Sequence, residues 1–336
     1  MPQSKENRIE AFARARGAVG APARLRGDAS TRSFYRVALR AGSAVLMTRD
    51  ELLPEEDRIF VEVRDHLAAC GAAVPEIYEW DRENGIVLME DFGDLTLEER
   101  LSGAGGDERR RLYRLAIDEL LTIQVSGTCL RRDCVAFHRA FDERKLMEEL
   151  DFFLLHTVEG LCGAALSGDE REEIRSGFAE LSARLAAMPR VLNHRDYHSR
   201  NLMVVGERLG IVDFQDARMG PCQYDLASLL RDSYTVLEGA FRAEMADYYL
   251  GASRDRGMEL RDRAGFMERL DLASLQRNLK ACGTFGAMAV VRGNRRYLAS
   301  LDPTLAYVRE NAPKFPFMDG CMKLLARRVP QLGRGG

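Results

Sequence analysis

The sequence predicts an α+β protein with two lobes, a small N-terminal lobe built on an antiparallel sheet and a larger, mainly helical C-terminal lobe. Residues 33–90 contain short strand patterns bounded by turn residues, whereas helical patterns dominate from Thr96 onward. At 336 residues, 46% of them hydrophobic, the chain is long enough to bury a full core. We expect residues 1–91 to form the N-terminal lobe and residues 92–336 the C-terminal lobe, with a short connector at residues 91–94.

The expected N-terminal lobe consists of a hairpin, one helix and a second hairpin. The helix opens at Pro54, places apolar residues along one face, and ends near Gly71. Asn84-Gly85 lies between two apolar runs and is a strong signal for a tight hairpin turn. The expected strands of the two hairpins are residues 33–39, 44–48, 77–80 and 86–90, and residues 23–26 are a further strand candidate.

Capping patterns mark helices in the C-terminal lobe. Thr96 is followed at the third position by Glu99, which is typical of a capping box at a helix start. Ser167 and Glu170 repeat the same pattern. One strand hairpin, within residues 202–212, interrupts the helical region.

Three polar residues around that hairpin indicate phosphoryl-transfer chemistry. Asp196 is followed at the fifth position by Asn201, and Asp213 comes directly after a short apolar run, which is the order of a kinase catalytic loop and its metal-binding segment. If residues 202–205 and 209–212 pair as a hairpin, Asn201 and Asp213 lie at the same end of it. Carboxylate and amide oxygens suit Mg²⁺. We therefore expect Asn201 and Asp213 to bind Mg²⁺, and Asp196 to orient and deprotonate the attacking hydroxyl.

An alternative is that each of these residues serves only in turns or caps, the commonest role of a lone Asp or Asn between strands. Turn chemistry gives no reason for three such residues to converge on one point, so the functional interpretation is favoured.

The loop at residues 194–201 resembles the His-Gly-Asp-Leu-His-Pro-Gly-Asn loop of the aminoglycoside phosphotransferase and choline kinase superfamily. Its departures from that form resemble one branch, the bacterial anomeric kinases that phosphorylate N-acetylmuramate and N-acetylglucosamine at C1 in cell-wall recycling. The resemblance implies a bilobal protein-kinase-like fold, ATP as the donor and Mg²⁺ as the cofactor. It also implies that residues 1–91 are the nucleotide-binding lobe and residues 92–336 the catalytic and substrate-binding lobe. The departures are Arg195, Tyr197, Ser199 and Arg200, and further similar segments are residues 27–30, 212–218, 224–232 and 275–280.

The donor site is expected near the start of the chain and at the connector. Ser30, Thr31 and Arg32 belong to a polar segment whose small side chains and backbone N–H groups can approach phosphate oxygens, although an ordinary polar turn is the alternative. Glu90 and Phe92 would present backbone groups to the purine edge.

A lysine that most kinases place on the third small-lobe strand is missing from residues 45–49. The anomeric kinases resemble this chain in that respect. Arg32, Arg36 and Arg49 are candidates to bind the phosphates in its place, because a guanidinium can bind phosphate in a bidentate manner. Each of them can equally be a solvated surface arginine.

The acceptor side carries basic residues. Residues 277–296 include five Lys or Arg and no Asp or Glu, which favours an anionic acceptor over a cationic one, although a solvated helix face is the alternative. Arg277 and Lys280, three residues apart, are expected to reach the acceptor, and His198 is a further substrate candidate. Asp225 most simply caps the following helix; the resemblance implies that it also braces the catalytic loop.

Charge and composition limit the possible partners and location. A formal net charge of −3 gives no electrostatic footprint for nucleic acid. No run is long and apolar enough to span a membrane, and the polar first residues do not resemble a signal peptide. Seven scattered cysteines without a Cys-x-x-Cys pair suggest reduced thiols. We expect a cytoplasmic protein and predict no oligomeric state.

These observations favour a small-molecule kinase that transfers the γ-phosphate of ATP to the anomeric hydroxyl of N-acetylmuramate or N-acetylglucosamine. One alternative is a phosphotransferase of the same superfamily that acts on an aminoglycoside, choline or another sugar. A second alternative, suggested by the missing lysine, is a nucleotide-binding pseudokinase, but such a protein has no need of Asp196 as a base.

Overall fold

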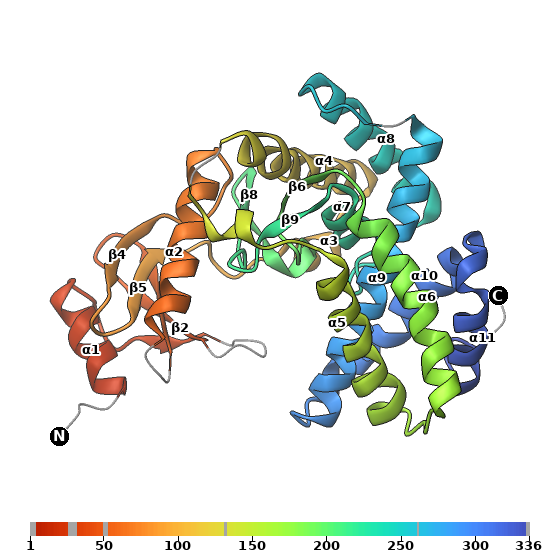
Figure 1. The fold of residues 1–336 in the computed structure, drawn as a ribbon. Helices are drawn as coiled ribbons and strands as arrows, with labels where there is room; N and C mark the ends of the chain where they lie inside the picture. Colours follow the sequence, from red (N-terminus) through yellow and green to blue (C-terminus); the bar gives the residue numbers. More distant parts are fainter. Residues whose placement is uncertain (1–4, 26–31, 50–52, 131–132, 261, 334–336) are drawn as a thin grey trace.

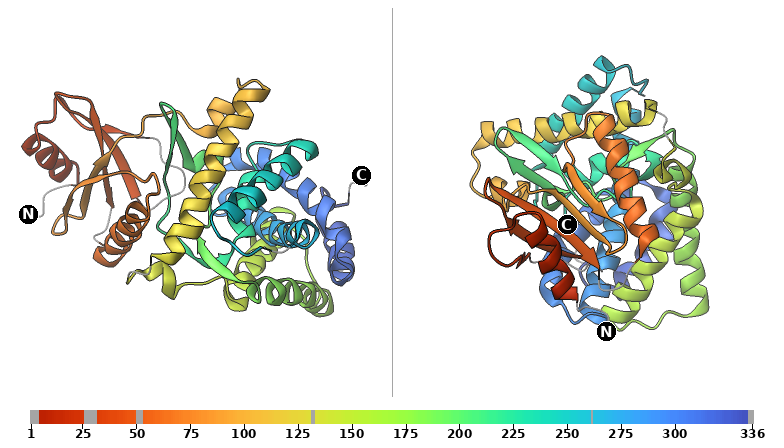
Figure 2. Two further views of the ribbon diagram at one scale, coloured as in Figure 1. Left: turned by 90° about the horizontal axis from the view of Figure 1, so that it is seen from above. Right: turned by 90° about the vertical axis from the view of Figure 1, so that its left-hand side faces the viewer.

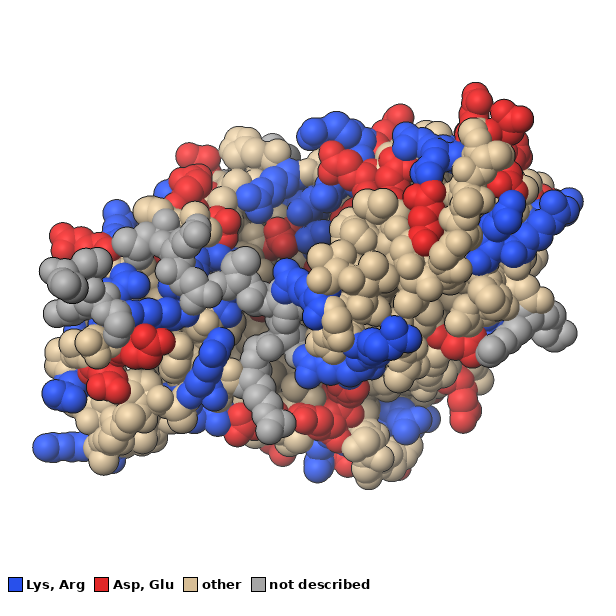
Figure 3. Space-filling view, turned by 90° about the horizontal axis from the view of Figure 1, so that it is seen from below, with Lys and Arg blue, Asp and Glu red and all other residues tan. Residues whose placement is uncertain are grey.

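The computed structural model describes residues 5–25, 32–49, 53–130, 133–260 and 262–333, which form a small sheet-based lobe beside a larger helical lobe (Figure 1). The predicted α+β architecture is confirmed. Basic and acidic side chains are interspersed over the face seen in Figure 3. Among the described helices, none combines the length and the apolar character that crossing a membrane requires.

The small lobe contains a five-stranded sheet in the order β1-β2-β3-β5-β4, in which all neighbours are antiparallel. The four strands expected in the two hairpins are present, and the strand candidate at residues 23–26 is present at one edge as a two-residue strand. The strands are β1 (Ala23–Arg24), β2 (Arg32–Ala38), β3 (Ser43–Arg49), β4 (Ile77–Asp81) and β5 (Ile86–Glu90).

One helix covers each face of this sheet (Figure 2). Alternate residues of a strand point to opposite faces. In β3, Leu46 joins the core under α1 (Lys5–Ala15), whereas Met47 joins the core under α2 (Pro54–Ala69). The sequence predicted only α2. Helix α1 was missed because only Ile9 and Phe12, with one alanine, carry its buried face.

The larger lobe is mainly helical, and both predicted capping boxes, at Thr96 and Ser167, are present. Its α-helices are α3 (Leu97–Leu101), α4 (Gly106–Leu121), α5 (Glu143–Phe153), α6 (Gly168–Ala186), α7 (Gln223–Leu230), α8 (Gly239–Asp255), α9 (Arg263–Val290), α10 (Leu301–Asn311) and α11 (Asp319–Arg328). Two π-helical segments extend α4 and α5, namely η1 (Thr122–Gly127) and η3 (Leu154–Leu161). Short 3₁₀ segments are η2 (Val135–His138), η4 (Ser199–Asn201), η5 (Arg295–Ser300), η6 (Ala312–Lys314) and η7 (Pro316–Met318).

Two antiparallel strand pairs interrupt the helices. The predicted hairpin is formed by β7 (Leu202–Val205) and β8 (Arg208–Ile211), with Leu202 opposite Ile211. The second pair joins β6 (Arg190–Asn193) to β9 (Arg218–Pro221). Both pairs converge on the chain between β6 and β7 that carries residues 194–201.

Helix α9 packs against α5, α7, α10 and η3 and is the central helix of the lobe. Two glycines allow the closest of these approaches. A Cβ atom on Gly286 would lie 2.5 Å from the Thr157 hydroxyl oxygen, and one on Gly283 would lie 2.9 Å from the backbone of Phe153. Because only glycine fits at these positions, α9 and η3 are held in a fixed relation, reinforced by a 2.6 Å hydrogen bond from Thr157 to the carbonyl oxygen of Cys282.

Candidate active site

A buried carboxylate fixes the loop at residues 194–201. The Asp225 side chain accepts hydrogen bonds from the backbone N–H groups of His194 at 2.5 Å and Arg195 at 2.9 Å. The predicted capping role of Asp225 is wrong, since α7 begins at Gln223 and its N-cap residue is Cys222. Burial raises the pKa of the Asp225 carboxyl to about 7, although both N–H donors favour its ionised form.

His194 connects this loop to the segment that follows β8. Its Nδ1 accepts a hydrogen bond from the backbone N–H of Asp196 at 3.3 Å, so the proton resides on Nε2, which donates to the carbonyl oxygen of Val212 at 2.9 Å. Burial lowers the pKa of the His194 imidazole and keeps it neutral. The imidazole thereby links the position of Asp196 to that of Asp213.

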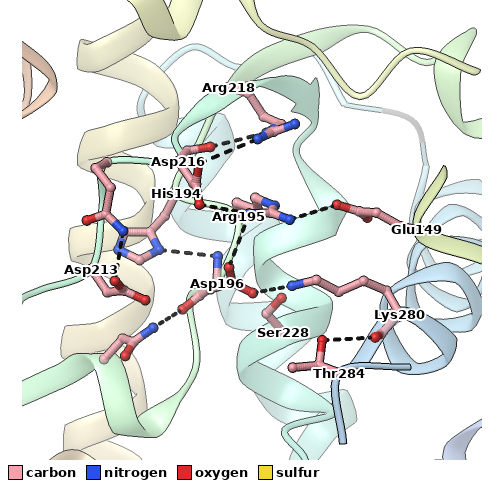
Figure 4. A network of polar contacts seen from close by, with 12 residues as sticks. Glu149, His194, Arg195, Asp196, Asp213, Asp216, Arg218, Ser228, Lys280 and Thr284 are labelled. Carbon is pink, nitrogen blue, oxygen red and sulfur yellow. Dashed lines mark hydrogen bonds and ion pairs between the residues drawn. The ribbon is translucent and has the colours of Figure 1, made fainter. Parts of the chain in front are cut away.

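The Asp196 carboxylate lies between two cations (Figure 4). Lys280 Nζ from α9 donates to Oδ1 at 2.6 Å, and a guanidinium nitrogen of Arg195 lies 3.9 Å from Oδ2. Burial alone would raise the pKa of Asp196, but Lys280 and Arg195 outweigh burial and hold it well below its usual range. Asp196 is therefore ionised at neutral pH.

Arg195 adopts a backbone conformation that L-residues rarely use, with φ of 86°. The superfamily loop has glycine at this position, which relieves the strain of roughly 1–3 kcal/mol that a side chain adds. Here the side chain extends between Glu149 of α5 at 3.0 Å and Asp216 at 2.9 Å. Sequence reasoning missed Glu149, because it lies 46 residues from Arg195 with no local motif to indicate it.

Asn201 and Asp213 lie at the same end of the β7–β8 hairpin, as predicted from the strand pattern. Asn201 accepts a backbone hydrogen bond from Val212 at 3.0 Å, and its amide nitrogen donates to the carbonyl oxygen of Asp196 at 2.9 Å. Asp213 has φ of 65°, and its Oδ1 accepts from Gln215 at 2.9 Å. Burial raises the pKa of Asp213. The side chains of Asp196, Asn201 and Asp213 line one cavity.

A cavity of 300 Å³ between the sheet and the β7–β8 hairpin is lined by three residues predicted for the donor site, Arg32, Glu90 and Phe92. Asp213 lines it as well. Phe92 packs directly on the glycine face of β8, where a Cβ atom on Gly210 would overlap its ring. The predicted residues Ser30 and Thr31 lie outside the described part of the chain.

The three arginines considered as replacements for the missing lysine have different surroundings. Arg36 forms ion pairs with Asp91 and Asp94, both in the connector. Arg49 is buried and forms an ion pair with Asp57 at 2.9 Å. Arg32, by contrast, lines the 300 Å³ cavity, where its guanidinium carbon lies 5.4 Å from the centre of the Phe60 ring.

A second cavity, of 240 Å³, lies on the other side of Asp213 and contains the residues predicted for the acceptor, His198, Arg277 and Lys280. Arg277 is 3% exposed and donates to the hydroxyls of Ser228 at 3.0 Å and Ser233 at 3.2 Å. Within the described residues no carboxylate forms an ion pair with it. Burial lowers the pKa of His198 to about 3, so its imidazole is neutral. Aromatic side chains that sequence reasoning did not identify, Tyr234, Phe285 and Tyr297, complete the wall.

Comparisons with known proteins agree with this geometry. Residues 23–260 match the family model described as "Phosphotransferase enzyme family". An N-acetylmuramate/N-acetylglucosamine kinase of Pseudomonas aeruginosa is 32% identical over 308 residues, which cover 90% of this chain and 87% of that protein. A protein of the same name from Neisseria meningitidis is 27% identical over 304 residues, which cover 90% of this chain and 89% of that protein.

Solved structures share the fold. A choline/ethanolamine kinase family protein from Mesorhizobium loti superposes with a TM-score of 0.61 at 17% identity, covering 98% of each chain. A thermostable mutant of aminoglycoside phosphotransferase APH(4)-Ia, in a ternary complex with ADP and hygromycin B, superposes with a TM-score of 0.59 at 14% identity, covering 90% of this chain and 99% of that chain. The predicted bilobal protein-kinase-like fold is thereby confirmed.

Proposed function

Because this chain belongs to the phosphotransferase enzyme family, we propose that it transfers the γ-phosphate of ATP to the anomeric hydroxyl of N-acetylmuramate or N-acetylglucosamine, in peptidoglycan recycling. The observation that carries this proposal is the position of Asp196. Its carboxylate lines the acceptor cavity together with Asn201 and Asp213, and Asp213 also lines the donor cavity. The names of the related kinases support the choice of sugar.

In this proposal Asp196 orients the sugar hydroxyl and accepts its proton. A carboxylate with a lowered pKa is a weak base, but phosphoryl transfer passes through a loose transition state in which positioning and charge stabilisation supply most of the rate enhancement. The anomeric hydroxyl is also more acidic than an ordinary alcohol, because the ring oxygen withdraws electrons from C1. A weakly basic Asp196 therefore suits this acceptor.

The donor set around Asp213 fits Mg²⁺. Asn201 donates from its amide nitrogen to the Asp196 carbonyl oxygen, which leaves the amide oxygen as a hard ligand beside the Asp213 carboxylate. We propose these two residues as the Mg²⁺ ligands. Two protein ligands are sufficient, because Mg²⁺ retains water and binds substrate phosphates. Bound Mg²⁺ would neutralise charge on the β- and γ-phosphates.

We assign the donor cavity to ATP. The backbone at Glu90 and Phe92 is proposed to contact the purine edge, and Arg32, on the same cavity wall as Asp213, is proposed to contact phosphate. Ser30 and Thr31 remain predictions for the phosphate contacts. The division of the chain into residues 1–91 and 92–336 is likewise proposed as the functional division into a nucleotide lobe and a catalytic lobe.

The charge of the acceptor cavity supports an amino sugar over a cationic aminoglycoside or choline. Arg200, Arg277 and Lys280 contribute three cations to it, against the carboxylates of Asp196 and Asp213, which are assigned to catalysis and metal binding. A polycationic acceptor would find no further carboxylate among the lining residues. We propose that His198 and Arg277 contact the sugar ring. The use of ATP and seven free thiols support a cytoplasmic location.

An acceptor screen tests the proposal. Purified protein with ATP and Mg²⁺ is incubated with N-acetylmuramate, N-acetylglucosamine, kanamycin or choline, and ADP release is measured. We expect ADP release with the two sugars, accompanied by loss of the sugar's reducing end. Turnover of kanamycin or choline in preference to both sugars would reject the acceptor assignment. Nucleotide binding without turnover of any acceptor would favour a pseudokinase.

A further inference from the structure

A cavity larger than the acceptor cavity lies directly beside it. Its volume is 640 Å³, compared with 240 Å³ for the acceptor cavity, and the two share Lys280, Thr284 and Met288 as lining residues. Small-molecule sites commonly measure about 300–1,000 Å³. The acceptor cavity alone is therefore small, whereas the larger cavity has room for a further part of the same molecule. We call it the α5–α9 cavity, after the helices that form its walls.

The charges in the α5–α9 cavity favour an anionic ligand. Four of its lining residues are cations and two are carboxylates. Three of these cations are already paired, Lys145 with Glu148 at 3.4 Å, Arg195 with Glu149 at 3.0 Å and Lys280 with Asp196 at 2.6 Å. The lining residues alone therefore sum to a formal charge of +2, four cations less two carboxylates. The four cations are Lys145, Arg195, Lys280 and Arg292, and the two carboxylates are Glu148 and Glu149.

One wall of the α5–α9 cavity is apolar. Phe152 is 40% exposed and Val291 is 67% exposed, although large hydrophobic side chains are usually covered. Met288 lies between the two cavities. An apolar wall beside cations suits a short carbon chain that ends in a carboxylate.

The shape of this cavity is fixed before any ligand binds. The contacts that Gly283 and Gly286 allow hold α9 against the end of α5 and η3, which carry the opposite wall. Lys280, hydrogen-bonded to Asp196, marks the border between the two cavities (Figure 4). A substituent on the sugar ring can therefore pass Lys280 and enter the α5–α9 cavity while the ring itself stays in the acceptor cavity.

We propose, resting on the function proposed above, that the α5–α9 cavity binds the carboxylate-bearing chain on O3 of the acceptor, and that it admits chains extended by amino acids. The substrate class is then 3-O-carboxyalkyl amino sugars, including those that carry a short peptide. N-acetylglucosamine, which lacks this chain, uses the acceptor cavity alone.

The test fills the α5–α9 cavity without altering the acceptor cavity. Ala287 lines the former and not the latter, so Ala287→Trp adds bulk only there. Val290→Trp is the matched control, because Val290 lies on the same helix, is exposed, and lines neither cavity. We expect Ala287→Trp to lower the ratio of kcat/KM for N-acetylmuramate to that for N-acetylglucosamine by about ten-fold or more. The ratio should be unchanged in Val290→Trp.

Two further acceptors keep the inference testable if Ala287→Trp does not fold. The unmodified protein should phosphorylate N-acetylmuramyl-L-alanyl-D-isoglutamine with kcat/KM within about ten-fold of that for N-acetylmuramate. No turnover of this glycopeptide, or an unchanged sugar ratio in a folded Ala287→Trp protein, would overturn the inference. A greater loss with N-butanoylglucosamine than with N-acetylmuramate would assign the cavity to the N-acyl group and also overturn it. Failure of the unmodified protein to phosphorylate either sugar would instead reject the proposed function.

Discussion

Asp225 offers the sharpest test of how the catalytic loop is held. Its carboxylate accepts the backbone N–H groups of His194 and Arg195, which immediately precede Asp196. The replacement Asp225→Ala removes the acceptor for both donors in a fully buried position. An unpaired buried donor costs about 1–3 kcal/mol, so the two together should destabilise the folded protein by about 2–6 kcal/mol.

The pH dependence of this loss has a definite sign. The pKa of Asp225 is raised from its ordinary value to about 7 in the folded protein, so the native state binds a proton that the unfolded chain releases. Its contribution to the free energy of unfolding is fully present below the unfolded pKa and is lost as pH rises through about 7. The difference in stability between the unmodified protein and Asp225→Ala should therefore be larger at pH 5 than at pH 8.

Hydrogen exchange followed by mass spectrometry measures the local effect, and urea unfolding measures the global one. In Asp225→Ala the amides of His194 and Arg195 should exchange faster, and kcat should fall because Asp196 is no longer held in position. Asp94→Ala serves as the control, since Asp94 is an exposed carboxylate far along the chain from the loop. Exchange of the two amides at the unmodified rate, together with unchanged stability, would refute the assigned role of Asp225.

Four further outcomes are expected. Asp196→Asn should retain ATP binding but lose turnover by roughly 10² to 10⁴, as for a positioned general base; steady-state kinetics with near-normal kcat would exclude that role. Asp213→Ala should lose Mg²⁺-dependent ATP affinity, and calorimetry showing unchanged affinity would mean that Asp213 is not a Mg²⁺ ligand. Because Lys280 and Arg195 hold the pKa of Asp196 well below its usual range, an acid limb that Asp196→Asn removes from the kcat/KM profile should lie below the usual range of an aspartate, and such an Asp196-dependent limb near neutrality would contradict this. Arg277→Ala should reduce kcat/KM for N-acetylmuramate and N-acetylglucosamine alike, since Arg277 lines the acceptor cavity and not the α5–α9 cavity. A loss confined to one sugar would mean that Arg277 does not contact the part that the two sugars share.

The features that were predictable from the sequence are those with a local pattern. The β7–β8 hairpin follows from two apolar runs around a polar turn, and it brings Asn201 and Asp213 together because the ends of paired strands are adjacent. The capping boxes at Thr96 and Ser167 were predictable for the same reason, since each depends on residues only three positions apart.

Features that depend on distant residues were not predictable. Lys280 was expected at the acceptor, but its ion pair with Asp196 joins residues 84 positions apart and has no local signature. Arg277 and Lys280 lie three residues apart on α9, yet their side chains bind different groups. Arg277 donates to two serine hydroxyls, whereas Lys280 donates to Asp196. The two π-helical segments carry no residue pattern that distinguishes them from the α-helices they extend.

The cations around Asp196 bear on how the enzyme treats ATP when no sugar is present. Water can enter the acceptor cavity far more readily than a sugar, and a kinase that activated such water would waste its nucleotide. With Lys280 bonded to Oδ1 and Arg195 facing Oδ2, the carboxylate has little tendency to take a proton from water, which is a weaker acid than the anomeric hydroxyl. In the mechanism proposed above, these two cations therefore limit the hydrolysis of ATP by water without any movement of the lobes.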